Sequence, residues 1–329
     1  MKNMRPSTDR EKKRPVLQRP PGFRPLKRGP FFAVLALLLL LLCIGCGQDK
    51  DSQGRPSVDL DRKVALPPPV SPLARDDFKV AVAAIISPRG TAESYSPLLA
   101  RLEKELSRKV TLVQRRTYEE INQLVIDNQI DLAFICTGAY AVSPDRQHMT
   151  LLVVPQIQGK TTYQSFIIVA ASSPARHPED LADKVFAFTD PLSNTGHLYP
   201  RFLLQTLGFE PETFFKRTIF TYSHDRSIHA VASGVADGAG VDSLVYHYAL
   251  ASDPFLREKT RIIHASPEFG MPPVVVPIAT DPARLELLRT IFLDLHQTRE
   301  GAKALAGLGI DRFVPPDDTM YDNLYRPSQ

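Results

Sequence analysis

The chain has 329 residues, of which 43% are hydrophobic and 23% are charged, and its formal net charge is +4 at neutral pH. A chain of this length and composition can bury a substantial core in one or two domains, which excludes an intrinsically disordered protein. Its three cysteines and eight histidines show no zinc-ligand spacing, and Gly-x-Gly-x-x-Gly and Walker motifs are absent, so we expect no metal and no nucleotide cofactor.

The N-terminal segment has the features of a targeting sequence. Residues 1–30 contain ten lysines or arginines and two acidic residues, and an apolar run, Phe31–Ile44, follows them. Its fourteen residues are too few to span a bilayer comfortably but match the hydrophobic region of a signal peptide. The run leads into Cys43-Ile44-Gly45-Cys46, which resembles a lipoprotein processing site. We therefore expect residues 1–45 to be a lipoprotein signal peptide and Cys46 to be lipidated, with an uncleaved N-terminal anchor as the alternative.

Processing would reverse the sign of the net charge. Without residues 1–45 the formal charge changes from +4 to −4, so the basic pI reflects the targeting segment and does not indicate a nucleic-acid partner. Gly47 in place of Asp after Cys46 favours the outer membrane as destination. With Cys46 lipidated, Cys136 has no disulfide partner, and its position at the end of an apolar run predicts a buried structural thiol.

The mature sequence begins with a tether and continues as alternating strands and helices. Residues 46–77 are rich in Pro, Asp, Arg and Ser, and globular sequence extends from Phe78 to about Pro316. Hydrophobic periodicity predicts strands at 79–86, 110–113, 130–136, 151–154, 165–170, 185–189, 218–222, 238–241, 261–264 and 273–277. It predicts helices at 98–106, 118–128, 227–233, 285–296 and 302–308, and others that begin near 197 and 243.

Repeated strand–helix units indicate an α/β protein with a predominantly parallel sheet flanked by helices. Because the alternation restarts after Pro174, we expect two lobes. One lobe would contain residues 78–171 plus 275–329 and the other residues 172–274, with hinge crossings near Ala171 and Pro273.

The segment from Asp190 to Pro200 is the most informative part of the chain. Ser193, Asn194, Thr195 and Gly196 place small polar groups where an expected strand leads into an expected helix. Free backbone N–H groups and the positive end of the helix dipole favour an anion at such a position. The same residue types are also common as simple helix N-caps, so both roles remain open.

Side chains at the ends of other strands are further candidates. His224 and Asp242 each follow a strand, at the edge of the sheet where α/β proteins collect ligands. Tyr118 and Tyr163 are candidates to donate a phenol hydrogen bond from the first lobe. The structural alternatives are a helix-capping turn that leaves His224 exposed, a cap at Asp242, and half-buried tyrosines.

Ser193, His224 and Asp242 do not match a hydrolase triad. Ser193 lacks the Gly-x-Ser-x-Gly context, and Asp242 follows His224 along the chain, so we do not expect an enzyme. A carboxylate beside an anion is repulsive unless the ligand has a proton to donate. Phosphate, phosphite and phosphonates can carry one near neutral pH, whereas sulfate cannot, so Asp242 could select for phosphorus oxyanions.

Several of these motifs occur together in one known family. Over about residues 78–315, the chain resembles the periplasmic phosphate-, phosphite- and phosphonate-binding proteins of ABC importers, the PhnD-like family. The resemblance rests on Arg115-Arg116-Thr117-Tyr118, Ile130-Asp131-Leu132-Ala133-Phe134, Tyr163-Gln164-Ser165, Asp190-Pro191-Leu192-Ser193-Asn194-Thr195-Gly196, Ser223-His224 and Val241-Asp242-Ser243. It implies the type II periplasmic-binding fold, in which two α/β lobes close on a ligand about a hinge.

The resemblance also implies roles for individual residues. The oxyanion would contact the loop residues Ser193, Asn194, Thr195 and Gly196, and also His224, Tyr118, Tyr163 and Asp242. Where relatives that bind aminoalkylphosphonates have acidic residues, this chain has Leu244 and Pro272. This difference favours phosphate, phosphite or methylphosphonate over aminoethylphosphonate.

The function implied by the resemblance is that of a periplasmic solute-binding protein, anchored to the membrane through lipid on Cys46. It would deliver a small phosphorus oxyanion to an ABC permease and its ATPase, without a cofactor or a nucleic-acid partner. Two alternatives remain: a ligand-sensing lipoprotein that signals to a membrane-bound kinase, and an enzyme on a similar scaffold.

Overall fold

The computed structural model describes residues 77–322 and 324–325. The expected signal peptide, the lipidation site at Cys46 and the tether up to residue 76 lie outside the described residues. Across the part that is described, no helix is both long enough and apolar enough to cross a membrane.

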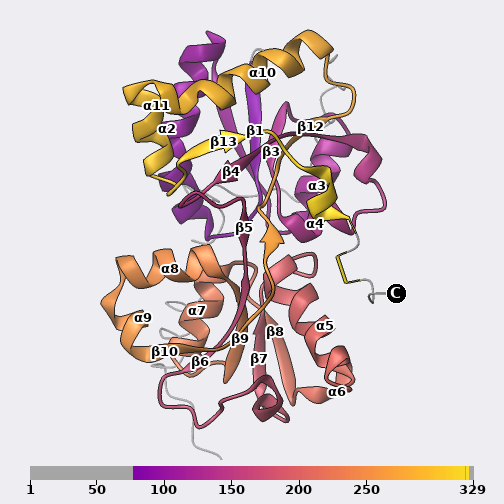
Figure 1. Ribbon diagram of the computed structural model, residues 1–329, viewed down its shortest axis with the longest axis vertical. Helices are drawn as coiled ribbons and strands as arrows, with labels where there is room; N and C mark the ends of the chain where they lie inside the picture. The colour runs from indigo at the N-terminus through magenta and orange to yellow at the C-terminus, as the bar shows by residue number, and fades with distance from the viewer. Residues whose placement is uncertain (1–76, 323, 326–329) are drawn as a thin grey trace, which may run out of the picture. The chain divides into compact units, whose positions relative to one another are not determined.

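The first lobe is built on a six-stranded sheet with the strand order β13-β4-β12-β3-β1-β2 (Figure 1). Its strands are β1 (Phe78–Val82), β2 (Val110–Gln114), β3 (Leu132–Phe134), β4 (Met149–Gln156), β12 (Val274–Pro277) and β13 (Arg312–Val314). The accompanying helices are α2 (Pro88–Leu106), α3 (Tyr118–Ile126), α4 (Thr137–Ala141), η2 (Arg146–His148), α10 (Pro282–Asp294), η5 (Leu295–Gln297), α11 (Arg299–Ala306) and η6 (Asp318–Tyr321).

The second lobe is built on a five-stranded sheet with the order β10-β6-β9-β7-β8. Its strands are β6 (Ser165–Ala170), β7 (Val185–Phe188), β8 (Arg217–Phe220), β9 (Gly238–Asp242) and β10 (Thr260–Ala265). Its helices are η3 (Pro178–Leu181), the π-helix η4 (Asn194–Leu198), α5 (Tyr199–Thr206), α6 (Pro211–Phe214), α7 (His224–Ala232), α8 (Ser243–Ser252) and α9 (Pro254–Lys259).

Both sheets bury apolar side chains on both faces. In β1, Val80 packs with Leu98 of α2, whereas its neighbour Ala81 packs in a separate cluster with Ile121 of α3. In β6, Ile167 and Ile168 are likewise divided between two clusters. Successive side chains of a strand point to opposite faces, so strands covered on both sides appear in the sequence as continuous apolar runs.

The expectation of predominantly parallel sheets is wrong, because both sheets are mixed. β1 lies parallel to β2 and β3, and β7 lies parallel to β8 and β9. In contrast, β12, β13, β6 and β10 are antiparallel to their neighbours. Hydrophobic periodicity identifies a strand, but the direction of its neighbour depends on how distant segments pair, which the sequence pattern does not show.

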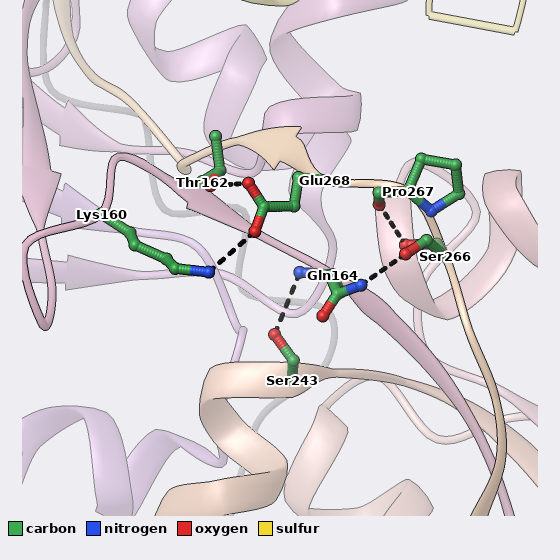
Figure 2. Close-up of polar contacts among 7 residues, drawn as sticks. All are labelled: Lys160, Thr162, Gln164, Ser243, Ser266, Pro267 and Glu268. Carbon is green, nitrogen blue, oxygen red and sulfur yellow. Dashed lines mark hydrogen bonds and ion pairs between the residues drawn. The ribbon is translucent and has the colours of Figure 1, made fainter.

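The lobes are connected by a pair of short crossing strands. β5 (Thr162–Tyr163) and β11 (Phe269–Gly270) pair antiparallel and run between the two sheets (Figure 1). Figure 2 shows the polar contacts beside them: Glu268 accepts hydrogen bonds from Lys160 Nζ at 2.9 Å and from Thr162 Oγ1 at 2.6 Å. The Ser243 hydroxyl accepts a hydrogen bond from the backbone N–H of Gln164 at 3.0 Å, which ties α8 to the crossing.

The first crossing lies earlier in the chain than expected. β6 pairs with β9 and β10, so residues 165–170 belong to the second lobe and the chain crosses at β5, not near Ala171. The chain returns through β11 to β12, next to Pro273. Periodicity identified β6 as a strand but carries no information about which sheet it joins, since that depends on its partners.

Candidate functional site

The structure brings the eight residues predicted for the site into one buried region where the lobes meet. The seven that have side chains, Tyr118, Tyr163, Ser193, Asn194, Thr195, His224 and Asp242, are each at most 4% exposed, and Gly196 is buried among them. They come from β5, β9 and the N-termini of α3, η4 and α7.

The loop between β7 and α5 has the conformation of a capped helix start. The Ser193 hydroxyl accepts a hydrogen bond from the backbone N–H of Gly196 at 3.0 Å, so the N-cap role considered for this residue is present. A Cβ at Gly196 would overlap the side chain of Thr189, so only glycine fits. The Ser165 hydroxyl donates a hydrogen bond to the Thr195 carbonyl at 2.7 Å, which fixes the backbone of this turn.

Asn194 connects two tyrosines. Its Nδ2 donates to the Tyr163 hydroxyl at 3.2 Å, and its Oδ1 accepts from the Tyr325 hydroxyl. From the sequence, we expect Tyr163 to lie in the first lobe. It lies instead on the crossing strand β5. No sequence motif indicated Tyr325. Its hydrogen bond to Asn194 forms only because the C-terminal segment packs against the loop that contains Asn194.

His224 is buried, so the alternative in which it is exposed is wrong. Its backbone N–H donates to the carbonyl of Ile85 at 2.9 Å. Its ring Nδ1 accepts a hydrogen bond from the backbone N–H of Asp242 at 3.1 Å. Because Nδ1 is an acceptor, the neutral ring carries its proton on Nε2, and this atom lies 3.4 Å from Ser193 Oγ. Burial lowers the pKa of His224 to about 3, so the ring is an uncharged hydrogen-bond donor at neutral pH.

Asp242 caps α8 and also faces the site. Its Oδ1 accepts hydrogen bonds from the backbone N–H groups of Leu244 at 2.7 Å and Val245 at 3.2 Å. Burial raises the pKa of Asp242 to about 7, so the carboxyl group changes its protonation state near neutral pH. Its backbone, and not its carboxylate, contacts His224, so these residues lack the Ser–His–Asp geometry of a hydrolase.

Two hydroxyl groups at the site stand out because they are buried without hydrogen-bond partners among the described residues. They belong to Tyr118, at the start of α3, and to Ser223, which precedes α7 and makes no side-chain cap bond. An unsatisfied buried polar group costs about 1–3 kcal/mol. Burial also raises the pKa of the Tyr118 phenol, which keeps it protonated as a donor. Two preserved donors of this kind fit a ligand with several oxygen acceptors.

Hydrogen bonds between the lobes surround this region. The backbone N–H of Tyr118 donates to Asp190 Oδ2 at 3.1 Å, and the N–H of Ser87 donates to Asp225 Oδ1 at 3.1 Å. The guanidinium carbon of Arg116 lies 4.3 Å from the ring centroid of Tyr222, so Arg116 acts between the lobes and not in the site. The lobes are therefore in direct contact around the candidate residues.

Gly138 allows the lobes to approach this closely. A Cβ at this position of α4 would lie 2.5 Å from the carbonyl oxygen of Leu192 and 2.7 Å from the backbone nitrogen of Asn194. Both are main-chain atoms of the opposite lobe, which cannot move aside as a flexible side chain can. Gly138 was missed in the sequence, because nothing near it indicates that another segment lies against α4.

Metal chemistry has no support in the described region, where no group of three or more His, Cys, Asp or Glu side chains is arranged to hold an ion. Cys136, the N-cap residue of α4, is buried as predicted. Burial raises the pKa of its thiol to about 11, which leaves it protonated and unreactive at neutral pH.

Comparison with known proteins connects this arrangement to one family. Residues 80–321 match the family model described as "ABC transporter, phosphonate, periplasmic substrate-binding protein". The "Phosphate-import protein PhnD" of Mycolicibacterium smegmatis is 33% identical over 168 residues, which are 46% of this chain and 51% of that protein, so the match spans about half of the relative's length. The "Phosphonates-binding periplasmic protein" of Escherichia coli is 25% identical over 229 residues, 68% of each protein.

Solved structures share the fold. A binding protein component of an ABC phosphonate transporter from Pseudomonas aeruginosa has a TM-score of 0.70 at 22% identity, over 74% of this chain and 83% of that one. PhnD1 from Prochlorococcus marinus, solved in complex with methylphosphonate, has a TM-score of 0.68 at 18% identity, over 76% and 95%. These likenesses confirm the two-lobed α/β fold of type II periplasmic binding proteins.

The family match, which covers most of the described chain, also confirms the resemblance seen in the sequence. Members of this family are substrate-binding components of transporters and not enzymes. The chain belongs to the family of periplasmic phosphonate-binding proteins of ABC transporters.

Proposed function

We propose that this protein is a lipid-anchored solute-binding protein that holds a small phosphorus oxyanion between its lobes and delivers it to a membrane permease. Phosphate, phosphite and methylphosphonate are the ligands we expect. The observation that carries the proposal is the pair of buried, unpartnered hydroxyls of Tyr118 and Ser223 beside the loop Ser193–Gly196. They come from opposite lobes, and a ligand with several oxygen acceptors would satisfy both.

Capture would combine several neutral donors. The Thr195 hydroxyl and the backbone N–H groups at the start of η4 would contact the oxyanion from the second lobe, together with His224 Nε2–H and Ser223. Tyr118 would close on it from the first lobe. Each hydrogen bond to a charged group contributes about 1.5–3 kcal/mol, so a few of them support micromolar affinity after the cost of ordering and closure.

The lipid anchor is supported by the sequence alone. Cys46 follows a signal-peptide-like apolar run, and about thirty residues of tether separate it from β1, so a folded domain could stand clear of a membrane surface. Gly47 after Cys46 supports attachment to the outer membrane, within the periplasm that is characteristic of the family.

Titration calorimetry with the purified full-length protein tests the ligand class. We expect saturable binding of at least one of phosphate, phosphite and methylphosphonate, and no binding of sulfate at pH 8.5. Aminoethylphosphonate should bind more weakly than methylphosphonate, because Leu244 and Pro272 offer no carboxylate to its ammonium group. Failure of every phosphorus oxyanion to bind would contradict the proposal.

Replacing Tyr118 by Phe separates binding from folding. The phenol lies near the Ser193 hydroxyl but meets no hydrogen-bond geometry within the described chain, so the melting temperature of the ligand-free variant should stay close to that of the wild type. Affinity should fall about ten- to hundred-fold, the value of one hydrogen bond to a charged ligand. Calorimetry and thermal unfolding measure the two effects.

Tyr321→Phe is the matched control. Tyr321 is also buried, but its hydroxyl donates to the carbonyl of Met271 at 2.7 Å, so this variant should melt at a lower temperature. If Tyr118→Phe lost stability in the same way and kept its affinity, Tyr118 would have only a packing role.

A further inference from the structure

A cavity of about 170 Å³ adjoins the candidate site. Asp242 lines the cavity and is also one of the candidate site residues. Ala83 lines the cavity too, and it packs in the same hydrophobic cluster as Tyr118. Its walls come from both lobes: Ile86 and Phe134 from the first, and Leu244 and Val245 at the start of α8 from the second.

The walls of this cavity are mostly apolar, with the hydroxyl side chains of Thr91, Ser94, Tyr95 and Tyr248 among them. Among the described residues that line it, Asp242 is the only one with a charged side chain, and both Leu244 and Pro272 are part of the lining. One oxygen of Asp242 is already occupied by the backbone N–H groups of Leu244 and Val245. An ammonium group in this space would lose much of its hydration, and its charged partner there would be the second carboxylate oxygen of Asp242.

The size of the cavity sets the size of its occupant. An engineered cavity of about 150 Å³ lined by aliphatic and aromatic residues stays dry and binds benzene. The cavity beside Asp242 is of the same scale, although it is partly open to solvent, so it has room for a phenyl ring or a short alkyl chain. Phosphate and phosphite have no substituent that could enter it, and methylphosphonate has one carbon.

We infer that this cavity is a subsite for an apolar substituent on phosphorus, so that the ligand held best is an alkyl- or arylphosphonate with about four to six substituent carbons. The inference rests on the proposed function, since the phosphonate group would occupy the Ser193–Gly196 loop while the substituent extends past Asp242. Burial of each added methylene should increase the affinity about four-fold until the cavity is filled.

Calorimetry of the full-length protein with a graded series tests the subsite. The series consists of phosphite and then methyl-, propyl-, butyl-, hexyl- and phenylphosphonate, with aminoethylphosphonate as the polar comparison. We expect affinity to rise from methyl to butyl by about ten-fold or more and phenylphosphonate to bind at least as tightly as butylphosphonate. A flat or falling series in which phosphite and methylphosphonate still bind would overturn the subsite and leave the proposed function intact. Loss of binding throughout would instead contradict the proposed function itself.

Leu244→Trp fills the cavity and adds a reporter. The chain has no tryptophan, so the new indole is the single such fluorophore. We expect the variant to bind methylphosphonate within about three-fold of the wild type but butyl- and phenylphosphonate at least ten-fold more weakly. Leu287→Trp, at a 52% exposed position of α10, is the matched control and should keep the full preference. Equal losses for short and long ligands in Leu244→Trp alone would show a general disturbance of α8 and overturn the assignment.

Discussion

Asp242→Asn should allow the protein to bind sulfate at pH 8.5, where the wild type should reject it. Sulfate has no proton at this pH, so an ionised Asp242 repels it, whereas the neutral amide of Asn has N–H groups to donate. Asn is also as good a helix cap as Asp, so the bonds to Leu244 and Val245 need not be lost. We expect at least ten-fold tighter sulfate binding by the variant, measured by calorimetry.

The pH dependence of sulfate binding gives the same hypothesis a second test. Burial raises the pKa of Asp242 to about 7, so below this pH the carboxyl group carries a proton that it can donate to sulfate. The affinity of the wild type for sulfate should therefore be highest near pH 5.5 and fall about ten-fold per pH unit above 7. Asp242→Asn should show no such decline between pH 5.5 and 8.5. Equal sulfate affinity of the wild type at both limits would remove the selective role of Asp242.

The stability of the folded protein should also depend on the protonation state of Asp242. The folded-state pKa of Asp242 lies above that of an unfolded aspartate, so its contribution to stability is present at low pH and lost as the pH rises through about 7. His224 acts in the opposite direction, because its pKa is lowered to about 3 and its ionisation on acidification favours unfolding. The difference in melting temperature between Asp242→Asn and the wild type isolates Asp242, and it should increase from pH 4 to pH 7.

Gly138→Ala should reduce ligand affinity about a hundred-fold or more without loss of stability in either lobe. The added methyl group would lie 2.5 Å from the Leu192 carbonyl oxygen and 2.7 Å from the Asn194 nitrogen, both across the interface between the lobes. The lobes could then not approach closely enough for Tyr118 and the Ser193–Gly196 loop to hold one ligand together. Loss of two or more hydrogen bonds to an anion accounts for the size of the effect.

Two other glycine variants show whether closure is the cause. Gly196→Ala places its methyl group against Thr189 of the same lobe, so it should lower the melting temperature of the ligand-free protein as well as its affinity. Gly90→Ala, in α2, meets only the flexible end of Ile86 at 3.3 Å and the Ser87 hydroxyl at 3.4 Å and should change neither. Small-angle scattering of Gly138→Ala with saturating ligand should show lobes further apart than in the wild type. Unchanged affinity in this variant would mean that the contact between α4 and η4 is not needed for binding.

The sequence determined the elements with the strongest local patterns. The run 165–170 is β6 with the predicted bounds, and the strand expected at 185–189 is β7, because apolar runs of this length bounded by turn residues have few other structures available. The sequence also determined the candidate site loop, since Ser193, Asn194, Thr195 and Gly196 are adjacent in the chain and form one turn. Together with the ordered motifs, this was sufficient to identify the family.

The tertiary structure alone decided how distant segments combine. Periodicity does not reveal which strands become neighbours, so the mixed pairing and the crossing at β5 emerged only from the sheet topology. The hydrogen-bond partners of each candidate site residue could not be predicted from the sequence for the same reason. The backbone N–H of Asp242 bonds to His224, and Tyr325 reaches Asn194 across 131 positions of sequence. The shifted pKa values of His224 and Asp242, the unpartnered hydroxyls and the apolar cavity all result from burial, which depends on long-range packing and not on the identity of a residue and its neighbours.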